Sequence, residues 1–299
     1  MWNLHRPKGE CRNKIIKRAK NTMIFIKVYI FMMVGLTVAF GFPPLQYMLS
    51  QYLTRKSLNY TYDYSVRVFI IEYPFDINSP LIYWPILCQE FWILIGLATC
   101  WVTGDTLFAS LITQLTIQFE ILENDINSQV KHDTNEINLK RNLIILVHRH
   151  RMILRVTEEL ERIFSPIIFV NAIVASMIIC VNVFVIEKQV TAGIYMEAAY
   201  NTFITMNTFL QITVYYVFAE TLTQTCLSIS NTIYECGWEN QNRDIRTYIQ
   251  ILLMKTQKPI YYTAYGLFTL THEQLIKIGN TAVSYYMMLR TTNQRSASF

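Results

Sequence analysis

Two short stretches contain residue types that could hold a metal ion or act as an acid or a base. The run HEQLI at 272–276 begins like the zinc motif H-E-x-x-H, but Ile276 stands where the second histidine is needed one helical turn on. The two histidines of the run HRH, His148 and His150, are two residues apart and so lie on different faces of a helix. Neither stretch is expected to bind a metal.

The other residues of catalytic chemistry form no recognisable motif. The sequence contains no G-x-S-x-G, no P-loop and no G-x-G-x-x-G. Its six cysteines form no C-x-x-C and are expected to be buried as small apolar residues. The net charge of +5 is concentrated in the flanks of apolar segments, which indicates membrane topology and not nucleic-acid binding. We therefore expect no enzymatic activity, no cofactor and no nucleic-acid partner.

The composition instead predicts an all-α, multi-pass membrane protein. Hydrophobic residues make up 52% of the 299, and charged residues only 16%. The segments 164–186 and 198–219 have no charge over 23 and 22 residues, and about 20 residues suffice to cross a hydrocarbon core. Weaker apolar segments at about 22–49, 81–104 and 275–289 bring the predicted spans to five. Pro43 and Pro44 are expected to break the first helix near its end.

Lysine and arginine counts in the flanking segments predict the orientation. Residues 1–20 and residues 126–163 each contain seven lysines or arginines, whereas the loop at 187–197 has only Lys188. The amino terminus is therefore predicted to be cytosolic, and the carboxy terminus, after five spans, to lie outside. The single N-x-[ST] sequon begins at Asn59, in the loop that this topology places outside, so Asn59 is a candidate glycosylation site.

Helical periodicity continues past the membrane on the cytosolic side. Apolar residues recur there every three or four positions in four segments, which predicts helices with one apolar face that pack together as a bundle. Polar His150 and Thr157 fall in register with the second of these faces. The four faces are Leu107, Leu111, Leu115, Phe119 and Leu122; Leu139, Leu143, Leu146, Ile153, Leu160 and Phe164; Leu222, Cys226, Ile229 and Ile233; and Ile245, Ile249 and Leu252.

The carboxy-terminal part resembles a known family. The stretch ETLTQTCLSISNTIYECGW (220–238), followed by Lys255, by Gln257-Lys258-Pro259 and by Ser284-Tyr285, is similar to the terminal signature of insect odorant receptors. The related gustatory receptors end in a T-Y-x-x-x-x-x-Q-F pattern. Ser284 replaces that threonine here and Gln-Phe is absent, which favours the odorant branch. Less distinct similarity extends upstream over essentially the whole chain.

The resemblance implies a seven-helix fold of which this sequence begins just before the third helix. It also implies a subunit of an odorant-gated, non-selective cation channel in the plasma membrane of olfactory sensory neuron dendrites. The expected partners are a small volatile odorant, membrane lipid and a co-receptor in a mixed tetramer. The predicted division is 1–20 cytosolic; 21–49 transmembrane; 50–80 extracellular loop; 81–124 transmembrane with cytosolic extension; 125–187 cytosolic helix and span; 188–238 span with extension; 239–271 cytosolic anchor helix; 272–291 pore-lining helix; 292–299 extracellular tail.

The resemblance also suggests site residues. In the last helix Lys277, Asn280, Ser284, Met288 and Thr291 form one mixed face, and the family's terminal motif implies that Met288 is an apolar gate and Thr291 influences selectivity. The proposed pore residues are Ser284, Met288 and Thr291. Odorants are small and apolar, so an aromatic-lined pocket is expected in the outer halves of the spans. The candidate ligand contacts are Leu36, Phe40, Phe91, Ile95, Tyr200 and Phe203.

Two acidic residues are expected in the second predicted span and at its end. Glu90 within the second span needs water or a polar partner, whereas Asp105 is expected at the cytosolic boundary.

Two alternative functions stay open. A gustatory-type receptor channel would work without the shared co-receptor. A non-conducting protein, either a truncated receptor or a transporter, would give no ligand-evoked current, and a transporter is disfavoured because the spans show no internal repeat.

Overall fold

The computed structural model describes residues 9–54, 62–69, 71–77, 79–132, 136–257 and 260–296. Within these residues the chain is almost entirely helical, which confirms the all-α prediction. In order, the elements are α1 (Glu10–Thr54), α2 (Pro80–His132), α3 (Glu136–Thr191), α4 (Tyr195–Glu235), the 3-10 helix η1 (Trp238–Asn240), α5 (Arg243–Thr256), β1 (Thr263–Ala264), β2 (Phe268–Thr269) and α6 (His272–Ser296).

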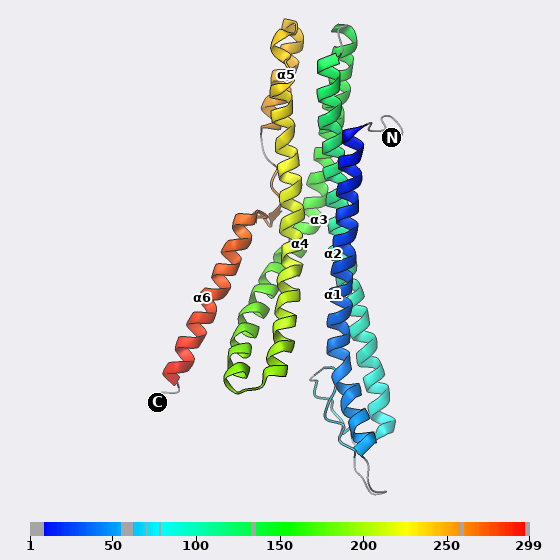
Figure 1. Ribbon diagram of the computed structural model, residues 1–299, viewed down its shortest axis with the longest axis vertical. Helices are drawn as coiled ribbons and strands as arrows, with labels where there is room; N and C mark the ends of the chain where they lie inside the picture. Colours follow the sequence, from blue (N-terminus) through cyan, green and yellow to red (C-terminus); the bar gives the residue numbers. More distant parts are fainter. Residues whose placement is uncertain are drawn as a thin grey trace.

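The helices α1 to α4 run side by side along the longest axis of the molecule (Figure 1). At 53 residues, α2 is about 80 Å long, more than twice the ~30 Å of a hydrocarbon core. The second half of α2, the first half of α3 and the second half of α4 form a bundle. Helix α5 joins this bundle at one end of the molecule (Figure 1). The helix α6 diverges from the others toward the opposite end (Figure 1).

Three of the described helices, α1, α2 and α3, are long and apolar enough to cross a membrane by length and composition. These long apolar helices support a membrane protein. Polar residues such as Asn207 and Gln211 interrupt the apolar stretch of α4, which nevertheless packs extensively against α2 and α3. The division of each helix into membrane and cytosolic parts stays a prediction.

The bundle core confirms the predicted apolar faces. Leu222, Cys226, Ile229 and Ile233 of α4 are all buried, as are the three predicted residues of α5. His150 and Thr157, the polar residues in register on α3, are buried as well, at 4% and 0% exposure. Leu107 is the exception: it is 50% exposed, and Phe108 occupies the core in its place. The apolar face of α2 therefore begins one residue later than the sequence predicts.

The predicted break at Pro43 and Pro44 is wrong, because α1 continues through both prolines to Thr54. Consecutive prolines remove two backbone donors, but the helix remains intact. Prolines are tolerated within membrane helices because neighbouring groups satisfy the freed backbone carbonyls. Pro44 is buried, and beside it Gly41 leaves room for the ring of Phe91 from α2. Contacts with α2 thus hold the outer end of α1 in a helical conformation.

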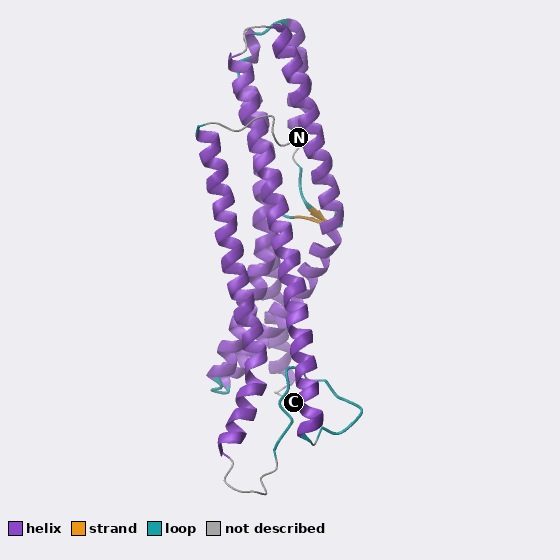
Figure 2. Ribbon diagram, turned by 90° about the vertical axis from the view of Figure 1, so that its right-hand side faces the viewer, coloured by secondary structure: helices purple, strands orange, loops and turns teal. Residues whose placement is uncertain are grey.

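A short β hairpin connects α5 to α6 (Figure 2). Thr263 pairs with Thr269 and Ala264 with Phe268, and the Leu267 amide donates to the Ala264 carbonyl at 3.0 Å. The two central residues of this turn, Tyr265 and Gly266, both have positive φ, at 52° and 68°. Two positive φ values are the requirement of a type I′ turn, which glycine meets without strain.

Candidate functional site

The second half of α1 and the first halves of α2 and α4 contain most of the predicted ligand contacts. Phe40 of α1 meets Tyr200 of α4 edge to face, with ring centroids 5.7 Å apart. Phe203, one turn after Tyr200, lies so close to α1 that a Cβ built on Gly35 would be 3.7 Å from its ring. All three aromatic rings are partly buried. The spacing of three that puts Tyr200 and Phe203 on one face therefore directs both toward α1.

Phe91 of α2 also packs against α1, but in a separate group with Met48, Tyr83 and Leu87. A Cβ on Gly41 would lie 2.6 Å from its ring edge, so the absence of a side chain at Gly41 is what allows the ring to fit. Leu36 packs against a small apolar cluster that contains Tyr29 and Met33. Ile95 is 54% exposed and lies outside this group in the monomer. We call Phe40, Tyr200 and Phe203, which lie between α1 and α4, the aromatic cluster.

Asn207 is a polar residue beside the aromatic cluster that was not predicted from the sequence. It is 2% exposed and follows Phe203 by one turn on α4. Its Nδ2 donates to the Phe203 carbonyl at 2.8 Å, while its Oδ1 has no hydrogen-bond partner among the described residues. A buried amide oxygen without a donor is costly in an apolar environment. An asparagine within an uncharged apolar run is the sequence signal that could have identified it.

Asp105 forms a second unpredicted feature, because its carboxylate is buried between helices. Tyr29 of α1 and Tyr215 of α4 each donate a hydroxyl hydrogen bond to its carboxylate, and the side chain is 1% exposed. Asn171 of α3 in turn donates to the Tyr215 hydroxyl at 3.4 Å. Four helices are thus joined through one carboxylate. We call this group the Asp105 network.

The described part of the connection between α1 and α2, residues 62–69 and 71–77, supplies the partners that Glu90 was predicted to need. Glu90 is 1% exposed and accepts from the Val68 amide at 3.0 Å and the Tyr73 hydroxyl at 3.3 Å. In the same loop Asp63 accepts from Tyr47 and from Ser65, and these donors hold the pKa of its carboxyl below the usual value. Asn59, the candidate glycosylation site, lies outside the described residues.

The last helix, α6, contacts the rest of the chain mainly near its start. Leu275 and Ile278 pack against the bundle core, and Lys277 pairs with Glu273 one turn before it at 2.8 Å. The predicted pore residues Ser284, Met288 and Thr291 are all exposed. The hydroxyls of Ser284 and Thr291 donate to backbone carbonyls of their own helix, to Asn280 and Met288 respectively. Their oxygens therefore remain available as acceptors on the surface of α6.

Hydrogen bonds join the segment before α6 to the bundle, to α3 from the β hairpin and to α4 from Ile260. Glu161 of α3 accepts from the Thr263 amide at 3.0 Å and from its hydroxyl at 2.5 Å. Ser165 accepts from the Tyr265 amide at 2.6 Å, and Thr223 of α4 donates to the Ile260 carbonyl at 2.9 Å. These hydrogen bonds attach the segment that precedes α6 to both α3 and α4.

The described residues offer no site for metal chemistry, since no three His, Cys, Asp or Glu side chains among them are arranged to hold an ion. His150 is buried in the bundle beside Phe119, and burial lowers the pKa of its imidazole. Ile276, in the position of the missing zinc ligand, is 63% exposed.

The family profile described as 7tm Odorant receptor matches residues 5–283. The chain belongs to the odorant receptor family. Its relatives include odorant receptor 45a of Drosophila melanogaster, 27% identical over 220 residues, a match that covers 72% of this chain and 55% of that receptor. Odorant receptor 67c of the same species is 24% identical over 276 residues, covering 89% and 65%.

Solved structures show the same fold. The insect olfactory receptor OR5 from Machilis hrabei in complex with eugenol superimposes with a TM-score of 0.75 at 18% identity, over 94% of this chain and 70% of that one. A second structure of the same receptor gives a TM-score of 0.74 at 19% identity, over 93% of this chain and 69% of that one. The chain spans about half the length of the curated relatives it matches. The family is one of receptors and not of enzymes, as the sequence predicts.

Proposed function

We propose that the chain is the odorant-binding subunit of an odorant-gated, non-selective cation channel, assembled with a co-receptor in a mixed tetramer. The single observation that supports odorant binding best is the aromatic cluster, in which Phe40 and Tyr200 meet edge to face between two helices. Aromatic surfaces from two facing helices suit a small apolar ligand, whose affinity comes from burial and dispersion. Asn207 supplies a buried oxygen that could accept a hydrogen bond from a ligand hydroxyl.

The pore is assigned to α6 for reasons of packing. In the monomer the apolar side chains of Val283, Met287 and Met288 in its far half are more than half exposed. An apolar helix face of this kind needs neighbouring subunits or lipid, and a ring of such helices around an axis would leave the Ser284 and Thr291 oxygens facing water. Ion flow would then be controlled by Met288, whose side chain can close a narrow pore by excluding water.

We also assign the plasma membrane as the site of function, with the amino terminus in the cytosol. The basic α1 amino end and the α2–α3 connection lie toward the same end of the molecule (Figure 1), which is the end that the lysine and arginine distribution places inside. The aromatic cluster then lies in the outer half, where an odorant arrives. Ligand binding would shift a closed–open equilibrium by its difference in affinity for the two states.

The test is current recording from cells that co-express the chain, within its complete receptor, with the co-receptor. Alanine at Tyr200 or Phe203 should raise the odorant concentration for half-maximal current at least several-fold, since each loses aromatic burial worth about 2 kcal/mol. Phe209→Ala is the matched control, because Phe209 is on the same helix but 48% exposed. Equal effects at all three positions would contradict the ligand site.

The pore assignment has its own test in the same recordings. Met288→Ala should raise the ligand-independent current, whereas Met287→Ala, its neighbour on α6 at similar exposure, should not. Cysteine substituted at Ser284 should be reached by a charged thiol reagent from the outer solution and reduce the current. Currents obtained without the co-receptor would instead support a gustatory-type channel, and absence of any current would support a non-conducting protein.

A further inference from the structure

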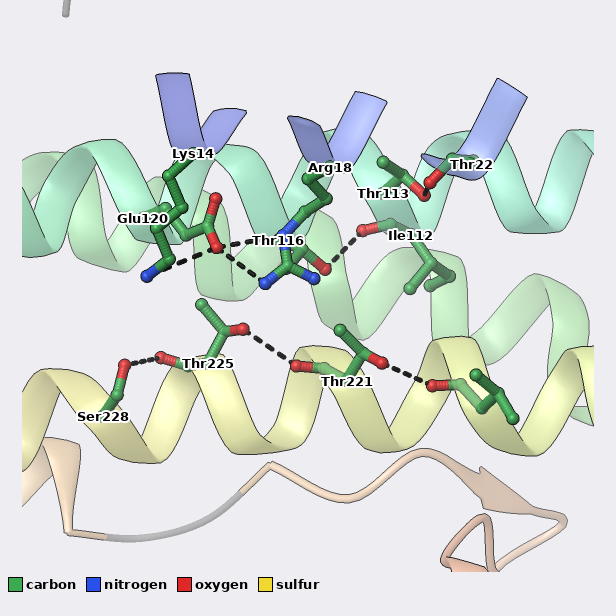
Figure 3. A network of polar contacts seen from close by, with 11 residues as sticks. Lys14, Arg18, Thr22, Ile112, Thr113, Thr116, Glu120, Thr221, Thr225 and Ser228 are labelled. Carbon is green, nitrogen blue, oxygen red and sulfur yellow. Dashed lines mark hydrogen bonds and ion pairs between the residues drawn. The ribbon is translucent and has the colours of Figure 1, made fainter. Parts of the chain in front are cut away.

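A pocket of about 510 Å³ lies between the amino end of α1, the middle of α4 and the first residue of α6. Lys14 and Arg18 line it from α1 and His272 lines it from α6, while a row of hydroxyl and carboxamide side chains lines it from α4. Figure 3 shows the α4 hydroxyls facing the Lys14 and Arg18 side chains across this space. The pocket is far from the aromatic cluster and has no part in the odorant-gated mechanism proposed above.

The α1 wall of the pocket provides positive charge that the protein does not fully neutralise. Arg18 is matched by Glu120 of α2, whose Oε1 accepts from its Nε at 2.9 Å and from its terminal nitrogen at 2.7 Å. Lys14 lies 3.6 Å from the same oxygen, and its side chain is 61% exposed, so most of its donor capacity is unused. Of the two cations that line this wall, Lys14 is therefore the one that can meet an anion.

The α4 wall has the opposite hydrogen-bonding character. Thr221, Thr225 and Ser228 donate their hydroxyl hydrogens to backbone carbonyls one turn earlier, at 2.7 to 2.9 Å (Figure 3). Their oxygens can then only accept. Glu220 adds a carboxylate whose Oε1 accepts from Gln224 at 2.7 Å and whose Oε2 has no partner among the described residues. A bare phosphate would be repelled here, whereas hydroxyl groups would find acceptors.

We propose that this pocket binds a phosphorylated polyol, of the kind carried by inositol phosphates and inositol phospholipids. Its phosphates would meet Lys14 on α1, and its ring hydroxyls would donate to Glu220 and Thr221 on α4. In the proposed orientation the pocket is at the level of the cytosolic headgroups, just beyond the predicted spans of α1 and α4, where anionic lipids attract basic residues. The bound group would contact His272 and so influence the start of α6.

Binding is measured on the purified full chain in phosphatidylcholine nanodiscs, with and without phosphatidylinositol bisphosphate, and with soluble inositol trisphosphate or inorganic phosphate. Binding of the lipid alone identifies a membrane ligand, binding of the soluble inositol phosphate identifies a cytosolic one, and either supports the proposal. Inorganic phosphate should compete weakly, because it lacks the hydroxyl donors. Absence of binding to both inositol compounds would overturn it.

Lys14→Gln should weaken binding about fivefold, corresponding to about 1 kcal/mol per lysine near an anionic group. Lys17→Gln removes the same charge from an exposed position on the same helix that does not line the pocket. Its effect should be much smaller. Equal losses would show general attraction to an anionic surface and would refute a defined site.

Glu220→Met distinguishes a polyol from a simple phosphate, because it removes both carboxylate oxygens at similar volume. A polyol should bind more weakly to this variant, whereas a phosphate held only by cations would bind more tightly, and that second result would overturn the proposal. Thr221→Val removes one acceptor and should also weaken binding, with Thr213→Val on the same helix as its control. Thermal unfolding of each variant verifies that it is folded.

Discussion

Replacing Tyr215 by phenylalanine removes one of the two hydroxyl groups that donate to the buried Asp105 carboxylate. The ring should stay in place, since it packs on Phe108 with centroids 4.9 Å apart. Hydrogen bonds to charged groups contribute about 1.5–3 kcal/mol, and at 1% exposure water cannot take the place of the missing donor at Asp105. We therefore expect Tyr215→Phe to lower the free energy of unfolding by about 2 kcal/mol.

The assay is an SDS titration of the purified chain in mixed micelles, with Tyr52→Phe as the control because Tyr52 is 66% exposed on α1. In an Asp105→Asn background the same tyrosine change should cost only about 1 kcal/mol, because a neutral amide accepts a weaker hydrogen bond. The difference is the coupling between the two residues. An effect of Tyr215→Phe equal to that of Tyr52→Phe, or an undiminished cost of Tyr215→Phe in the Asp105→Asn background, would refute the network.

Two further predictions concern the bundle. Phe108→Ala should cost about 3–5 kcal/mol by leaving a cavity, whereas Leu107→Ala, at an exposed position, should stay within about 0.5 kcal/mol, and SDS titration compares them. Burial lowers the pKa of His150, so the unfolded chain binds more protons below its ordinary pKa of about 6.5. Stability should therefore be complete above that pH and fall as the pH decreases below it. His150→Gln should reduce this dependence, whereas substitution of the exposed His148 should not; identical pH profiles would contradict the interpretation.

The helical faces of the bundle could be predicted because one physical rule determines them. Leu222, Cys226, Ile229 and Ile233 recur at the helical repeat, and a helix that extends beyond the membrane must bury such a face against another. The same rule placed Leu107 in the core incorrectly. Where α2 leaves its apolar segment, Leu107 and Phe108 are both apolar, so hydropathy alone does not decide which residue faces inward. Phe108 does so because its ring meets those of Phe164, Tyr215 and Tyr262.

The tertiary features that the sequence did not predict depend on partners far away along the chain. From the sequence alone, Asp105 is predicted to be a boundary residue. Its partners Tyr29 and Tyr215 are 76 and 110 positions away along the chain, and the packing of α1 and α4 brings them to it. The β hairpin lies inside the segment 239–271 that was expected to be an anchor helix. Its Tyr265-Gly266 turn is a local signal for a reversal, but the strands are only two residues long and are fixed by Glu161 and Ser165 of α3.

Under the proposed function and orientation, these contacts suggest how ligand binding could reach α6. The Asp105 network joins α1, α2, α3 and α4 at the level where the helices pass from the aromatic cluster into the bundle, and hydrogen bonds from the hairpin and from Ile260 join α3 and α4 to the segment before α6. A ligand that separates α1 from α4 at Phe40 and Tyr200 must therefore either strain the buried hydrogen bonds of Asp105 or move α4 with α1. In the second case we expect the segment at Ile260, which accepts from Thr223, to move with α4 and to displace the start of α6.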